Sequence, residues 1–391
     1  MVLDDKIIDV LVERIVNRVE KGNTFILEQI GKTIKNIGSL NATSVHQLSK
    51  ILKYGSNYDK IVQELAKITN LNIQDIIDIF NAVAKENYIF AKQFYDYRGI
   101  EYIPYEQNLA LKRQVRAIAE LTVGEYINLS KTTGFATKDI YGNLQYTPLA
   151  QMYQQVIDEA TLLVSQGKVD FNKGMYKTVK ELGNSGIRVI SYASGYHRRA
   201  DSAIRMNLKD ALRDMSITLQ KQFGEEFGAD GIEVSHHTNS APDHIDSVDG
   251  KQFTIDECNN INDSLKRHVG ELNCYHYVFP IILGVSKPNY TKEEIQADKE
   301  KNIKGCEIDG KHYTLYEASQ LQRRLETEIR RNKDKQIIGV ASGNKEIVQE
   351  AQRRITQLTN KYREVSKISG LPTKLERARV IGYKRKDINK M

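Results

Sequence analysis

The segment Glu233–His244 reads EVSHHTNSAPDH and lies in the part of the sequence where helical periodicity is interrupted. The wider stretch Gly195–Ser286 holds six of the eight histidines and two of the three cysteines of the chain. Short apolar runs at Gly231–Ser235 and Gly250–Ile255, bounded by turn-forming residues, predict short strands joined by ordered loops. We therefore expect a small α+β unit here, set between helical flanks.

The flanks have apolar residues at spacings of three and four, which is typical of amphipathic helices. This spacing predicts helices at residues 1–22, 24–37, 57–68, 73–94, 108–132, 199–227, 315–334 and 345–366. Asn72 is expected to cap the fourth of them. Asp309-Gly310 predicts a hairpin turn between two short strands. The expected fold class is mainly α with a small α+β unit, in an elongated multi-helix protein.

Three turn-rich connections suggest how the chain is divided. A tyrosine-rich segment contains Gly99 and Pro104, a second turn falls at Gly183–Gly186, and a third begins near Pro288. The expected segments are an N-terminal helical array at 1–105, a helical connector at 106–186, the small α+β unit at 187–286 and a basic C-terminal helical region at 287–391.

The net charge of +7 is unevenly distributed along the chain. Residues 287–391 contain 25 Lys and Arg against 15 Asp and Glu. Such an excess favours contact with nucleic acid or another polyanion. It is also what the solvated faces of polar helices contain, because Lys and Arg there alternate with Glu. Both interpretations remain open from composition alone.

Composition argues against a membrane or a disulfide-stapled protein. No window approaches the roughly 20 consecutive apolar residues that a membrane helix needs, and the N-terminus lacks the basic and apolar parts of a secretory signal. Three cysteines cannot all pair, which suits a reducing compartment in which thiols stay free or bind metal. We expect neither export nor membrane insertion.

Four side chains in the histidine-rich stretch are candidate metal ligands. His237 and His244 lie seven residues apart across a Ser-Ala-Pro turn, and Cys274 and His276 follow about thirty residues later. Imidazole and thiolate ligands from two loops suit a four-coordinate zinc ion. The spacing permits zinc without being diagnostic, because the chain has no pair of CxxC knuckles.

Two other interpretations compete with the metal. The histidines can hold the loops in shape through hydrogen bonds, with Asp243 and Asp249 as acceptors. A catalytic His/Asp arrangement, as in a metal-dependent hydrolase or nuclease, needs a nucleophile beside a positioned base. Nothing in the spacing selects Ser235, Ser240 or Asp243 for such a role.

An ordered set of short motifs resembles the minor capsid (head) proteins of tailed phages of Gram-positive hosts, which are related to the Mu F-like head-morphogenesis proteins. Together these motifs span roughly residues 150–380. They are Val164–Gly167, Tyr192–Gly195, Arg205, Ser235–His237 with Pro242–His244, Asp249–Phe253, Asn273–His276 with Pro280 and Gly284, and Tyr316–Ala318 with Gln322-Arg323. Their order along the chain is more specific than any one of them.

The chain departs from the family pattern at several arginines. Asn239–Ala241 stands where the family has Gly-Ala-Arg, Tyr275 replaces the Arg between Cys and His, and Tyr196-His197 occupies another Arg position. Roles of those arginines are therefore not carried over. All four candidate ligands match the pattern.

The resemblance implies a structural virion component without enzymatic activity. Such a protein would act at the portal vertex or inside the head, in assembly, DNA packaging or delivery. Its expected partners are portal and capsid proteins, with packaged DNA meeting the basic region 287–391, and no membrane. The alternatives are a metal-dependent hydrolase or nuclease using the His/Cys cluster, and a free nucleic-acid-binding module.

Overall fold

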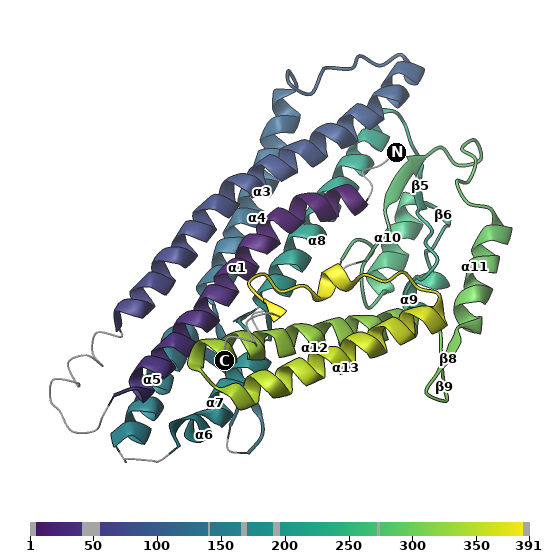
Figure 1. The fold of residues 1–391 in the computed structure, drawn as a ribbon. Coiled ribbons are helices and arrows are strands. Elements are labelled where there is room, and N and C mark those ends of the chain that lie inside the picture. The colour runs from purple at the N-terminus through teal and green to yellow at the C-terminus, as the bar shows by residue number, and fades with distance from the viewer. Residues whose placement is uncertain are drawn as a thin grey trace.

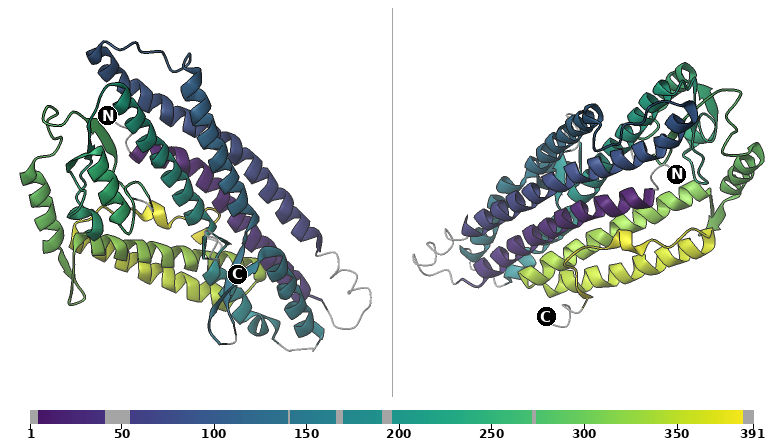
Figure 2. Two further views of the ribbon diagram at one scale, coloured as in Figure 1. Left: turned by 180° about the vertical axis from the view of Figure 1, so that it is seen from behind. Right: turned by 90° about the horizontal axis from the view of Figure 1, so that it is seen from above.

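The computed structural model describes residues 5–40, 55–139, 141–165, 170–190, 196–271 and 274–385. Long helices dominate it (Figure 1). They are α1 (Asp5–Gly38), α3 (Gly55–Arg98), α4 (Leu109–Lys131), α8 (Ala200–Glu226), α12 (Leu315–Ser342) and α13 (Lys345–Ser369). Seen from above, α3, α1 and the α12–α13 pair lie in successive layers (Figure 2). The expected mainly α class with a small α+β unit is confirmed.

Shorter elements extend both ends of this bundle. A four-stranded antiparallel sheet has the order β2-β1-β3-β4, from β1 (Gly134–Lys138), β2 (Leu144–Pro148), β3 (Arg188–Ile190) and β4 (His197–Arg199). The helices α5 (Leu149–Ser165), α6 (Phe171–Gly174) and α7 (Tyr176–Ser185) connect its strands. Among the described residues no helix is both long and apolar enough to cross a membrane.

The small α+β unit follows α8. Its antiparallel sheet has the order β6-β5-β7, from β5 (Gly231–Val234), β6 (Gln252–Thr254) and β7 (Val278–Ile281), with the short helices α9 (Pro242–Ile245) and α10 (Ile255–Ser264). Next come α11 (Lys292–Lys304), the hairpin of β8 (Cys306–Ile308) and β9 (Lys311–Tyr313), and, after α13, the 3-10 turn η1 (Leu375–Ala378). The hairpin turn is confirmed, with positive φ at Asp309 and Gly310.

Two predicted helix breaks are wrong. Residues 5–38 form one helix, in which Gly22 lies so close to Ile68 that a Cβ would meet its Cδ1 atom at 2.9 Å. Residues 55–98 also form one helix, because Asn72 does not act as a cap there. Its amide donates to the Tyr126 hydroxyl (2.8 Å) and accepts from Arg18 (3.1 Å). Both residues serve contacts between helices that local sequence does not reveal.

The main hydrophobic core draws on all four segments expected from the sequence. It runs from Ile8 in α1 through α3, α4 and α8 to Ile337 in α12. Two smaller clusters lie within single segments, one around β5 and β7 and one between α12 and α13. The division of the chain into four domains stays a prediction.

Charged side chains are buried where α8 meets α12. The Arg199 guanidinium donates to Asp334 (2.6 Å) and Asp201 (3.3 Å), and Arg330 donates to the second oxygen of Asp201. These residues come from β4, α8 and α12, and all of them are buried. Removing one partner of such a network leaves an uncompensated charge, at about 3–5 kcal/mol. Local sequence does not reveal this network, because Arg199 and Asp201 lie more than 120 residues from Arg330 and Asp334.

Glu20 on α1 lies beside this network and generates a pH-dependent prediction. Burial, and secondarily Asp201, raise its pKa to about 7. The folded chain therefore holds this proton more tightly than the unfolded chain, and the stability it contributes at low pH is lost as the pH rises through about 7. We expect Glu20→Gln to raise the unfolding free energy by about 1–3 kcal/mol at pH 8, with the gain vanishing near pH 4.5. Urea denaturation across that range measures it. An equal gain at both pH values would contradict the assignment.

Candidate metal centre

Two neighbouring strands and one short helix bring the candidate ligands together. Ser235 extends the pairing of β5 with β7, because its amide donates to the Tyr277 carbonyl (2.8 Å) and its hydroxyl accepts from the Tyr277 amide (2.9 Å). His237 and His276 therefore lie on adjacent chain segments. Pro242 begins α9, which carries His244 into the same region. His244, Cys274 and His276 are all buried.

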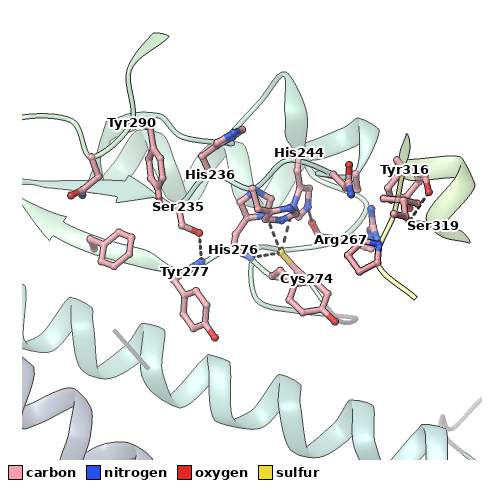
Figure 3. A pocket seen from close by; sticks show the side chains of 18 of the residues that line it. Ser235, His236, His244, Arg267, Cys274, His276, Tyr277, Tyr290, Tyr316 and Ser319 are labelled. Carbon is pink, nitrogen blue, oxygen red and sulfur yellow. Dashed lines mark hydrogen bonds between the residues drawn. The ribbon is translucent and has the colours of Figure 1, made fainter. Parts of the chain in front are cut away.

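Three of the four predicted ligands converge (Figure 3). Their ligand atoms lie within 4.8 Å of one another. The two Nδ1 atoms of His244 and His276 are 3.2 Å apart, and the Cys274 sulfur is 3.6 Å and 3.2 Å from them. Zinc bond lengths of 2.0–2.1 Å to nitrogen and 2.3 Å to sulfur, at tetrahedral angles, place ligand atoms roughly 3.3–3.6 Å apart. The three atoms have the spacing of one face of such a tetrahedron.

The hydrogen bonds of the two Nε2 atoms determine that the Nδ1 atoms of His244 and His276 point toward Cys274. His244 Nε2 lies 2.8 Å from the Arg267 carbonyl oxygen, and His276 Nε2 lies 2.8 Å from an Asp249 oxygen. A carbonyl and a carboxylate only accept, so both Nε2 atoms carry the proton. In the neutral rings both Nδ1 lone pairs then face the sulfur. Histidines whose second nitrogen is held in this way are typical of metal sites.

Ionisation also favours a cation at this point. Burial opposes a charge on Cys274, but hydrogen bonds with His244 and His276 outweigh it and lower the pKa of the thiol to about 5. Burial likewise opposes protonation of His276, yet Asp249 and Cys274 raise the pKa of its ring to about 9. Without a metal, both shifts favour a thiolate beside an imidazolium. With a metal, the cation takes the place of that proton.

Asp249 organises the surroundings of the cluster. Its fully buried carboxylate accepts from His236 Nδ1 (2.6 Å), His276 Nε2 (2.8 Å), the Ser240 hydroxyl (2.7 Å) and the His237 amide (3.2 Å). Burial works against its charge, but these hydrogen bonds hold the pKa of Asp249 at about 2. Asp249 therefore accepts hydrogen bonds from histidines, as expected from the interpretation in which such bonds hold the loops in shape.

The remaining predicted residues lie at the edge of the cluster. The rings of His237 and His276 are tilted by 43° with centroids 4.3 Å apart, but the His237 nitrogens do not belong to the convergent group. Its Nε2 atom is buried and has no hydrogen-bond partner among the described residues. Asp243, expected to accept from a histidine, instead accepts from Arg267 (2.8 Å). His236, which the sequence analysis did not single out, lies between Asp249 and Asp298.

A cavity of about 990 Å³ lies against the cluster. The loops after β5, the approach to β7, the start of α12 and residues 371–377 all contribute to its walls. Figure 3 places Tyr290 and Ser235 toward one end of it and Tyr316 and Ser319 toward the other. The cluster can therefore hold a metal through three protein ligands, with one coordination position left for His237 or a molecule from the cavity.

The protein is thus a long helical bundle with a small unit that is held together by histidine, cysteine and aspartate side chains. Comparisons with known proteins agree with the resemblance found in the sequence. The sequence model of the family described as phage minor capsid protein 2 matches residues 3–365. The chain belongs to this phage minor capsid protein family, and thus to the structural proteins of phage particles. No curated protein and no solved structure gave a significant match.

The motifs behind the resemblance have structural roles in the described residues. Gln322 donates to the Ser366 hydroxyl (2.8 Å) and so joins α12 to α13. Arg205 pairs with Glu13 of α1 at 2.8 Å. The motif positions Gln166-Gly167, Tyr192–Gly195 and Asn273 lie outside the described residues.

We expect Asp249→Asn to lower the unfolding free energy by about 2–4 kcal/mol, because an amide nitrogen would face donors that now share a buried carboxylate. Urea denaturation in a chelator measures this without a metal contribution. The matched control is Asp243→Asn, whose carboxylate pairs with Arg267 in a partly exposed position and should cost less than about 1 kcal/mol. Equal losses in the two variants would contradict the central position of Asp249.

Proposed function

We propose that this protein acts in the phage head as a structural component at the portal vertex or inside the capsid, in head assembly, DNA packaging or delivery. The observation that carries this proposal is the family match over residues 3–365. Long helices with extended surfaces suit lateral association with portal and capsid proteins. The basic region 287–391 suits a position near packaged DNA.

We propose further that one zinc ion binds to His244, Cys274 and His276, with His237 in the fourth position after its ring turns toward the cluster. Support comes from the convergence of the three ligand atoms and from the unpartnered Nε2 of His237. Such an ion would fasten α9 to the segment before β7. Its part in the head would be structural, because binding energy at a site of this kind contributes directly to folding.

Elemental mass spectrometry of the purified protein is expected to find about one zinc per chain. Cys274→Ser and His276→Ala should lose the zinc and unfold at lower temperature, because each removes a ligand from a buried site. The matched control is Cys258→Ser, which alters a buried thiol on α10 outside the convergent group. It should keep the zinc. Zinc that persists in the ligand variants, or none in the unaltered protein, would contradict the site.

The role in the head is tested in a phage that lacks this chain. Plaque titre should fall by orders of magnitude, and supplying the chain in trans should restore it. Quantitative mass spectrometry of purified virions should find far fewer copies of the chain than of the major capsid protein. An unchanged titre, or absence of the chain from virions, would contradict the role independently of the zinc result.

A further inference from the structure

Among the described residues, Lys and Arg outnumber Asp and Glu in the lining of the cavity beside the metal centre. Five cationic side chains line it, from segments that are distant in sequence: Arg267, Lys287, Arg323, Lys374 and Arg377. Arg267 pairs with Asp243, but the other four form no salt bridge within the described part of the chain. An excess of cations around one cavity favours an anionic ligand.

Among the described residues one carboxylate, that of Glu326, lines the cavity, and the five cations outnumber it. Glu326 accepts a hydrogen bond from the Tyr362 hydroxyl at 3.1 Å and is buried in α12. Burial raises the pKa of Glu326, against the charges of Arg377, Arg330 and Arg323, which lower it. Even with Glu326 charged, the five Lys and Arg side chains leave a cationic excess over this carboxylate.

Aromatic rings also line the cavity. Phe90 and Phe94 of α3 line one side of the cavity, and Tyr275, Phe279 and Tyr290 line the side of the small α+β unit. Cations and aromatic rings in one cavity suit a single-stranded nucleic acid, because phosphates meet the charges and bases stack on the rings. At about 990 Å³ the cavity is as large as the largest common small-molecule sites, and it has room for more than a lone phosphate ion.

We propose that this cavity binds a short stretch of single-stranded nucleic acid, with Arg323 and Arg377 contacting its phosphates. The inference adds a ligand to the head role proposed above and does not depend on the metal. It places nucleic-acid contact in one cavity, whereas the charge count alone assigns it to the whole basic region 287–391. A duplex presents its phosphates outward and its bases paired, so it cannot place unstacked bases on the aromatic wall.

The test uses the full-length protein and a fluorescently labelled single-stranded oligonucleotide, with affinity measured by anisotropy at several salt concentrations. The double variant R323A/R377A should bind about tenfold or more weakly than the unaltered protein. The slope of log K against log salt should become shallower by about 1.4, because two phosphate contacts are lost from a single strand. The unlabelled duplex of the same sequence should compete poorly.

The matched control is R324A/R379A, which removes the same charge from exposed arginines that neighbour the first pair but do not line the cavity. It should bind within about twofold of the unaltered protein. Thermal denaturation of both variants checks that they are folded. Equal losses in the two double variants, tighter binding of duplex, or no binding at low salt would each overturn the proposal. Repeating the assay in a chelator separates this result from the metal site, since binding should persist there.

Discussion

The buried carboxylate of Asp249 is the constraint on which the histidine-rich unit depends. It accepts from two imidazoles, one hydroxyl and one backbone amide, and thereby fixes three loops relative to the sheet of β5, β6 and β7. Because His276 donates its Nε2 proton to this carboxylate, its Nδ1 lone pair is turned toward Cys274 and His244. Asp249 thus orients one of the three convergent ligands, and the Arg267 carbonyl oxygen orients His244.

The long helices provide a rigid support for this unit. α8 packs against α1, α3 and α4, and it also contacts β7 at the edge of the small sheet. The buried pair of Arg199 and Asp334 connects the start of α8 to α12. Since α12 also lines the cavity, the position of its cationic side chains relative to the metal centre is set by the bundle core. The cavity is a product of the whole fold, and no single segment forms it.

Much of this architecture could be predicted from local sequence. The helix from about residue 199 to 227, the strand after Gly231 and the hairpin at Asp309-Gly310 all have local signals, and the structure has all three. Local signals failed at Gly22 and Asn72, where contacts between helices override a usual breaker and a usual cap. There, packing with distant residues sets the conformation.

The site could be predicted only in part, because its geometry also depends on residues that are distant in sequence. Residue types suggested the ligand set, and three of its members converge, whereas the place of His237 at the edge depends on loop geometry that spacing does not encode. The cationic cavity could not be predicted from the sequence, because only the tertiary fold brings Arg267 and Arg377 to the same cavity. Composition showed that the C-terminal region is basic, but it did not show where in the fold the positive side chains lie together.

X-ray absorption at the zinc edge of the purified protein tests the central claim most directly, because it counts the ligand types around the ion. The account predicts one sulfur at about 2.3 Å and two or three nitrogens at about 2.0–2.1 Å. A bound ion with no sulfur, or with several, would contradict the assignment of His244, Cys274 and His276 as the centre of the site.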